Sequence, residues 1–220
     1  MGEFWEVLTG HFPEFAAGFL TTVRLVAVAF VIAMAVGTFV ASFRVTPSKW
    51  LNRLGGVYVE YFRNVPLLIL LFIIFYGLPQ ELHIEETVAG TVGLGLYTAA
   101  YVAETIRSGV FAVGKGQIDA GLSLGFTYAK TLRRIVLPQA VRTVIPPLGS
   151  LIIAMIKNSA VIGGALAVSD LLRTAREVNA DAGSAFTHET FFWAAAGYLV
   201  LTIAATIVVR RLETRFAIHR

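Results

Sequence analysis

Three consecutive polar residues, Lys157, Asn158 and Ser159, interrupt a long apolar stretch of this sequence. In the run from 143 to 169, Lys157 is the single charged residue and lies near the middle. A charge at such depth in an apolar helix costs about 2.5–3.5 kcal/mol to insert into a bilayer, so it is a candidate for function. A cation, an amide and a hydroxyl could together bind the charged groups of a small polar solute. Successive helical residues point about 100° apart, so the three cannot all face one cavity.

Each charge in an apolar run also has a purely structural explanation. Lys157 could pair with a carbonyl group, or with a carboxylate such as Glu104, and only fix packing. Arg24 lies about one and a half turns into the first apolar run. It could attract an anionic solute, or its long stem could carry the guanidinium out to the lipid headgroups. Both alternatives stay open at this point.

A glycine-rich polar segment, residues 108–142, separates two of the apolar runs. Within it Ile118, Leu122 and Phe126 recur every four residues, which is helical spacing. Gly121 and Gly125 repeat at the same interval and would let another surface approach the backbone beside this apolar stripe. The spacing predicts a helix from about 117 to 124 that a second surface can grip.

A basic stretch follows directly and ends this polar segment. Thr127 is a predicted N-cap for a helix from 128 to 136, and Pro138 is expected to stop that helix. The whole segment is then a helix, a glycine bend and a second helix. It could dock in a groove of a partner protein, or it could lie as an amphipathic hairpin on anionic lipid headgroups. Paired glycines favour docking, because lipid contact gains nothing from close backbone approach.

Five apolar runs have or approach the length that a membrane-spanning helix needs, about 20 residues for a hydrocarbon core of about 30 Å. They are residues 19–41, 64–80, 87–103, 143–169 and 190–209. Two runs are short, so we extend 64–80 back through 57–59 and 87–103 on toward Arg107. The first run follows acidic residues and lacks a basic leader, so we expect a retained helix and not a signal peptide. The prediction is an all-α polytopic membrane protein with about five spans.

Composition excludes several other classes of protein. Of the 220 residues 56% are hydrophobic and 15% are charged, too few charges to cover a soluble surface. The absence of cysteine excludes thiol catalysis, disulfides and cysteine-bound metals. The four histidines have no metal-ligand spacing, and no catalytic triad is visible, so we expect neither a metal site nor an enzyme. The modest net charge of +4 does not imply a nucleic-acid partner.

The distribution of charge predicts the orientation in the membrane. Of the 18 Lys and Arg residues, 14 fall after the first run, between the third and fourth runs, or in the C-terminal tail. Short loops rich in Lys and Arg stay in the cytoplasm, so the N-terminus is outside and the C-terminus inside. The opposite side holds acidic residues, namely Glu3, Glu6, Glu14, Glu81, Glu85, Glu86, Asp170, Glu177, Asp181 and Glu189. This gives an external segment 1–18, a transmembrane domain 19–212 with an internal segment 108–142, and a cytoplasmic tail 213–220.

The internal segment carries an ordered set of motifs. Asp119-Ala120-Gly121 is followed by Gly125 and then by Leu137-Pro138-Gln139-Ala140. In these residues the chain resembles the permease subunits of bacterial ATP-binding-cassette (ABC) importers, in the polar amino acid uptake branch. It departs from that pattern at Asp119, where Glu is usual, and at Gly121, where a second Ala is usual.

The resemblance extends over residues 20–165, most of the chain. Further matching motifs occur in the family's order and spacing: Tyr58-Val59-Glu60, Arg63-Asn64-Val65-Pro66-Leu67-Leu68, Ala100-Tyr101-Val102-Ala103-Glu104, Arg107-Ser108-Gly109, Gly116-Gln117, Pro146-Pro147-Leu148-Gly149 and Lys157-Asn158-Ser159. A single triplet would be weak, whereas an ordered set of this length is specific.

The resemblance implies a set of partners and roles. Two permease subunits, of the same or a related chain, form the pathway, two cytoplasmic ATPase subunits drive it, and an external amino-acid-binding protein delivers substrate. ATP and Mg²⁺ are expected on the ATPase, because the sequence has no G-x-x-x-x-G-K-[ST] phosphate loop. The residues expected to dock the ATPase are Asp119, Ala120, Gly121, Leu124 and Gly125. Membrane lipid is the remaining partner, and the bacterial cytoplasmic membrane the expected location.

Lys157, Asn158, Ser159 and Arg24 are the candidates for the substrate pathway. A cationic substrate would favour an acid beside Lys157, whereas Asn158 is neutral, and both Lys157 and Arg24 are cations. This favours glutamate, glutamine or aspartate as the substrate. The competing function is a self-sufficient secondary transporter or channel, although such transporters usually show inverted repeats of broken helices, which this sequence lacks.

Overall fold

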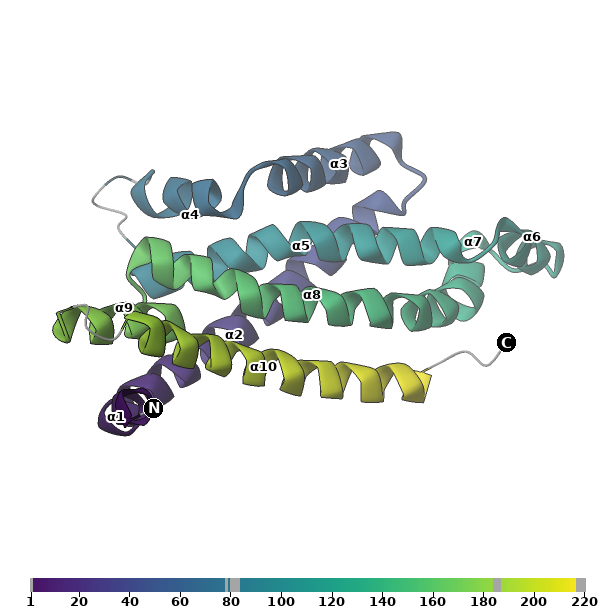
Figure 1. Ribbon diagram of the computed structural model, residues 1–220. Coiled ribbons are helices and arrows are strands. Elements are labelled where there is room, and N and C mark those ends of the chain that lie inside the picture. Colours follow the sequence, from purple (N-terminus) through teal and green to yellow (C-terminus); the bar gives the residue numbers. More distant parts are fainter. Residues whose placement is uncertain (1, 78, 80–83, 184–186, 217–220) are drawn as a thin grey trace.

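The computed structural model describes residues 2–77, 79, 84–183 and 187–216, and its regular elements there are all helices (Figure 1). They are α1 (Gly2–Gly10), α2 (Phe12–Arg44), α3 (Lys49–Asn64), α4 (Leu67–Tyr76), α5 (Glu86–Ala112), α6 (Lys115–Ser123), α7 (Tyr128–Thr131), the π-helical turn η2 (Leu132–Val136), α8 (Leu137–Leu166), α9 (Leu171–Asp181) and α10 (Thr187–Phe216). The predicted all-α class is confirmed.

Three helical stretches are each long and apolar enough to cross a bilayer. They are α2, the continuous run from Tyr128 to Leu166, and α10. They cover the predicted runs 19–41 and 190–209, and they cover the run 143–169 as far as Leu166, where α8 ends. In Figure 1, α8 and α10 run side by side, and α2 crosses the bundle obliquely.

The second predicted span is a bent pair of helices, α3 and α4, whose axes differ by 103°. The break falls at Val65, which is extended with φ −89° and ψ 128°, directly before Pro66. A proline disfavours the helical region for the residue that precedes it, and here the helix ends at that residue. The predicted span through 57–80 is therefore not one continuous helix. Residues 78 and 80 of that prediction lie outside the described part.

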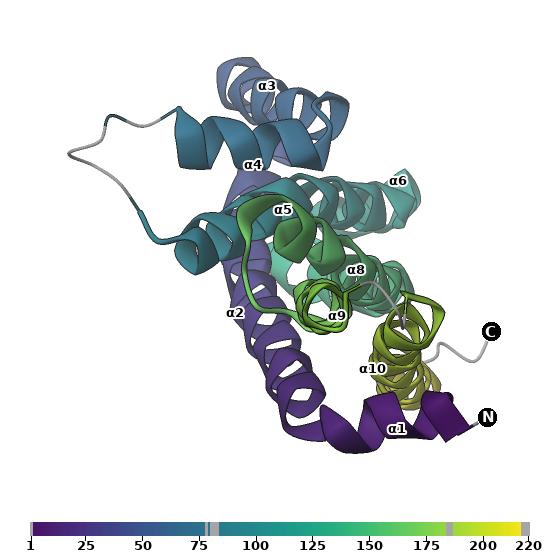
Figure 2. The same ribbon diagram turned by 60° about the vertical axis from the view of Figure 1, so that its left-hand side comes forward.

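Helix α5 is the central helix and contacts α2, α3, α4 and α8 (Figures 1 and 2). Small residues let its neighbours approach. A Cβ atom on Gly37 of α2 would lie 2.6 Å from Val102 Cβ, and one on Gly95 would lie 2.8 Å from Ile32 Cγ2. Although α5 has 27 residues, it is not among the helices apolar enough to be a span by composition alone. A helix covered by other helices does not need the large apolar side chains that lipid requires.

The basic helix from Tyr128 continues into α8 through the π-helical turn η2. Pro138 falls in the first turn of α8, where the missing N–H and the fixed φ are tolerated. The prediction that Pro138 ends the helix is therefore wrong, and the fourth span begins before residue 143. A π-helical turn inside a helical run often marks a functional position.

Both ends of the chain are more helical than predicted. α2 begins at Phe12, with a proline and Glu14 in its first turn, so the boundary predicted at 18/19 falls inside this helix. α1 precedes it and packs on α10, where the Trp193 Nε1 donates to the Phe4 carbonyl over 2.9 Å. α10 continues to Phe216, four residues into the predicted tail 213–220, and residues 217–220 lie outside the described part.

Candidate functional site

The polar segment folds as an elbow, which we define as α6, α7 and the turn between them, residues 115–131. It projects from one end of the bundle (Figure 1). The turn is a Schellman motif: the Phe126 N–H donates to the Gly121 carbonyl over 3.1 Å and the Gly125 N–H to the Leu122 carbonyl over 2.9 Å. Gly125 has φ +78°, a conformation that glycine adopts without cost. The Thr127 side chain accepts the Lys130 N–H over 3.3 Å, so the predicted N-cap is confirmed.

Gly121 joins the two arms of the elbow. It is buried, and a Cβ atom at this position would lie 2.6 Å from Thr131 Cγ2 and 3.1 Å from Ile135 Cδ1. The prediction that Gly121 offers open backbone to a partner is therefore wrong, because α7 and η2 already cover it. The absence of a side chain at Gly121 lets α6 pack closely on the helical run that continues into α8.

The other predicted docking residues lie together on the outside of the elbow. Asp119, Ala120, Leu124 and Gly125 are exposed, and Leu124 keeps 74% of its surface. Leu122 and Tyr128 add exposed apolar surface at 44% and 43%. The elbow therefore presents an exposed apolar surface together with one carboxylate, that of Asp119. Its docking role stays a prediction.

Two adjoining cavities lie between α5 and α8, and we call them together the polar lane. They share Tyr101 and Leu151 and have volumes of about 400 Å³ and 210 Å³. The polar side chains that line the lane are Arg63, Tyr97, Thr98, Tyr101, Glu104, Thr105, Ser108, Thr143 and Asn158. Since Asn158 and Thr143 are separated by four turns of α8, the lane follows this helix from its middle toward its start at the elbow.

Hydroxyl, cationic and anionic groups alternate along the lane. The Tyr97 and Tyr101 hydroxyls lie 3.0 Å apart, and the Arg63 guanidinium lies 5.4 Å above the Tyr101 ring. Glu104 accepts from Arg107 Nε over 3.0 Å and lies 3.5 Å from Arg44 Nη2. A carboxylate could therefore meet Arg63, and an ammonium could meet the tyrosine hydroxyls and Asn158.

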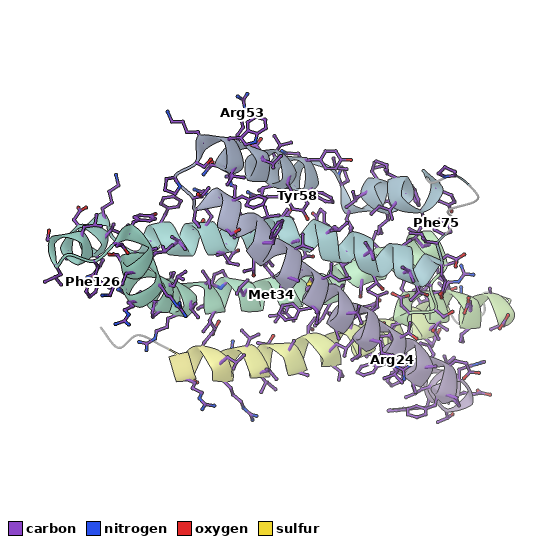
Figure 3. The ribbon with its side chains drawn as sticks, turned by 180° about the vertical axis from the view of Figure 1, so that it is seen from behind. Arg24, Met34, Arg53, Tyr58, Phe75 and Phe126 are labelled. Carbon is purple, nitrogen blue, oxygen red and sulfur yellow. The ribbon has the colours of Figure 1, made fainter. Side chains whose placement is uncertain are left out.

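Of the four predicted pathway residues, only Asn158 lines the lane. Ser159 is fully buried and donates to the Ile156 carbonyl over 2.8 Å. Lys157 and Arg24 are exposed and make no hydrogen bond or ion pair with the described residues. Figure 3 shows Arg24 on α2, far along the bundle from Phe126 of the elbow. The alternative pairing of Lys157 with Glu104 is not formed, because Arg44 and Arg107 hold this carboxylate.

A buried carboxylate lies at the other end of the bundle. It belongs to Asp170, one of the acidic residues predicted to lie outside. Asp170 is 0% exposed; it caps α9 by accepting the Arg173 N–H over 2.9 Å and accepts the Tyr198 hydroxyl over 2.7 Å. Burial raises the pKa of this carboxyl, and the two hydrogen bonds oppose the shift. Nearby, Thr22 of α2 accepts the Leu171 N–H over 3.2 Å. We call Asp170, Tyr198 and Thr22 the outer node, because they tie α2, α9 and α10 together.

Comparison with known proteins decides the family. Residues 33–218 match the family described as binding-protein-dependent transport system inner membrane component. The chain belongs to this family. It is therefore an inner-membrane transport component, a multi-pass subunit whose homologues are transport permease subunits.

Individual relatives extend the similarity over nearly the whole permease. The chain is 40% identical to a probable glutamine ABC transporter permease, GlnM of Bacillus subtilis, covering 96% of each. It is 31% identical to the glutamate/aspartate import permease GltJ of Escherichia coli K12, covering 90% of this chain and 86% of that one. A crystal structure of an amino acid ABC transporter with histidines has a TM-score of 0.88 at 32% identity, covering 94% of this chain and 96% of that chain.

Proposed function

We propose that this permease is the membrane-spanning subunit of an ATP-driven importer that carries a polar amino acid into the cell. The observation that carries the proposal is the elbow, an exposed surface held rigidly on the helix that lines the polar lane. Force applied to α6 passes through Gly121 and Thr131 to η2 and α8. A motor that moves the elbow would therefore move the lane wall as a rigid body. The amino-acid permeases among the relatives support this assignment.

The partners follow from this mechanism. A second permease subunit completes the pathway, two ABC-type ATPase subunits bind ATP and Mg²⁺ and grip the two elbows, and an external binding protein delivers the amino acid. We propose that the N-terminus lies outside and the elbow and C-terminus inside. Fourteen of the 18 basic residues support this orientation.

The polar lane is the proposed substrate pathway. It offers a guanidinium, an amide and several hydroxyls within one path, which is the set of groups that an amino acid zwitterion needs. Asn158 is neutral, and Glu104 is already paired with two arginines. The lane therefore has a free cation and no free carboxylate among its described residues, which favours glutamine, glutamate or aspartate over a cationic amino acid.

Uptake into proteoliposomes tests the proposal. The chain, reconstituted with an ABC-type ATPase and a binding protein encoded beside it, should accumulate labelled glutamine or glutamate only when ATP is present on the ATPase side. The chain alone should accumulate neither under a Na⁺ or proton gradient. Gradient-driven uptake by the chain alone would instead establish a secondary transporter. Uptake of arginine but not of glutamate or glutamine would refute the substrate assignment.

Substitutions at two adjacent positions of α8, assayed in the same vesicles, test whether the substrate passes along the polar lane or along another face of this helix. Asn158→Leu removes the amide from the lane and should lower uptake at least tenfold, with the chain still inserted. Lys157→Met changes the preceding residue, which is exposed and does not line the lane. It should cause a smaller loss of uptake. A larger loss in Lys157→Met than in Asn158→Leu would place the pathway on the other face of α8.

A further inference from the structure

An apolar groove lies where α2, α8 and α10 meet, near the C-terminal end of α10. We call it the inner groove; it has a volume of about 170 Å³, and its lining includes Met34, Ile145, Gly149, Ile152, Val209 and Leu212. Figure 3 shows Met34 where α2 crosses the bundle. Leu212 lines the groove and still keeps 44% of its surface exposed, so the groove opens to the surroundings of the bundle. Its wall is entirely apolar, which suits a hydrocarbon chain.

Two arginines flank the end of this groove that faces the elbow. Gly149 of α8 packs directly on Val209 of α10, which fixes the register of the two antiparallel helices. Arg142 lies seven residues before Gly149 and Arg215 six residues after Val209, so both lie about 9–11 Å beyond this contact in the same direction. Arg142 is three residues from Ile145 and Arg215 three from Leu212, which places each arginine on the groove side of its helix. Both are exposed.

The surrounding charges reinforce this rim. Arg210 and Arg211 precede Leu212 and are exposed, and Glu213 is the single acidic residue in the last two turns of α10. A second copy of this chain, packed symmetrically on the groove, would bring two such cationic rims together, which is unfavourable. A ligand with an anionic head and an apolar tail satisfies both parts of the site.

We propose that the inner groove binds one anionic phospholipid, with an acyl chain between α8 and α10 and the phosphate between Arg142 and Arg215. The phosphate then neutralises cations that would otherwise meet at the membrane surface. The acyl chain occupies the space lined by Met34, Ile145 and Ile152, beside the direct contact of Gly149 with Val209.

A second apolar groove on α10 provides an internal comparison. It has a volume of about 350 Å³ and is lined at the other end of the helix by Phe12, Phe15, Phe19 and Trp193, among others. The charged residues adjacent in sequence to this lining are His11, Glu14 and Asp170. The His11 and Glu14 side chains lie 3.7 Å apart, and Asp170 is buried. This second groove is larger and is also lined by apolar side chains, and no arginine is adjacent in sequence to its described lining. We therefore expect selectivity for anionic lipids at the inner groove and not at this second groove.

Native mass spectrometry of the purified chain, with phosphatidylglycerol and phosphatidylcholine added in turn, tests this site. The wild-type chain should retain one phosphatidylglycerol in preference to phosphatidylcholine. The double variant Arg142→Gln/Arg215→Gln should lower phosphatidylglycerol binding at least fivefold. The matched double variant Arg133→Gln/Arg134→Gln removes two exposed arginines outside the groove and should leave the preference intact.

Ile152→Trp tests the apolar groove independently of the arginines. The larger side chain fills the space for the acyl chain, and all arginines stay in place. It should also lower retention of the lipid. Three results would overturn the proposal. They are an equal loss of lipid binding in both arginine double variants, unchanged lipid retention in Ile152→Trp, and a dimer that excludes lipid from this face. The assay contains no ATPase and no amino acid, so its outcome is independent of the proposed transport function.

Discussion

Gly121→Leu is expected to lower ATP-driven uptake at least tenfold while the chain still inserts into the membrane. A side chain at this position meets Thr131, which is itself fully buried. Overpacking of this kind costs about 1–3 kcal/mol, and α6 can relieve it by moving away from α7. The exposed docking surface would then no longer be fixed to α8. Uptake and ATP hydrolysis, measured in the same proteoliposomes, should become uncoupled.

Gly116→Ala is the matched control on the same helix. A Cβ atom at Gly116 has no neighbour within 4 Å, so α6 should stay in place and uptake should remain within twofold of wild type. Gly125→Ala is an intermediate case, because it forces a residue with a Cβ atom into φ +78° at a cost of about 1–2 kcal/mol. Wild-type uptake by Gly121→Leu would show that a rigid elbow is not required for transport.

Gly163→Leu should cause the largest loss of folded protein of any substitution considered for this chain. Gly163 packs directly against the Asp170 carboxylate, and any side chain there displaces it. Asp170 would lose the Tyr198 hydroxyl and the Arg173 N–H, and a buried carboxylate without partners costs several kcal/mol. The yield of monodisperse protein after detergent extraction should fall at least tenfold.

Gly164→Ala tests whether this effect is specific to the outer node. At Gly164 a Cβ atom would lie 3.6 Å from Leu172 Cδ2, an ordinary van der Waals contact, so this variant should be extracted in wild-type yield. Asp170→Asn keeps an N-cap and an acceptor for Tyr198 and should lose less protein than Asp170→Leu. Similar yields for Gly163→Leu and Gly164→Ala would contradict a structural role for the node.

Signals confined to a few neighbouring residues predicted the elbow well. Thr127 caps α7 as predicted, and Gly125 makes the bend between the two helices. The Val65-Pro66 step carried an equally local signal for the bend between α3 and α4, but the length of the apolar run concealed it. Hydropathy reports the composition of an apolar run and does not report a change in the direction of the helix axis within it.

Contacts between distant residues could not be predicted from the sequence. Asn158 was selected together with Lys157 and Ser159, and only the packing of α8 on α5 distinguishes the one that meets Tyr97 and Tyr101. Asp170 has the sequence signature of an exposed N-cap, yet α10 and α8 bury it. Gly121 was singled out as a contact for a partner, but its neighbour is Thr131 of the same chain. In each case the missing information is which helices are neighbours.

We propose above that a separate ATPase subunit binds this permease at the elbow. Since the chain has no cysteine, Leu124→Cys introduces a single thiol on the exposed end of α6. Leu199→Cys, on an exposed face of α10, is the matched control. In membranes that contain the assembled transporter, a thiol-to-amine cross-linker should join Leu124→Cys, and not Leu199→Cys, to the ATPase subunit. Absence of this product, with a lipid-soluble thiol reagent labelling both positions equally, would contradict the account.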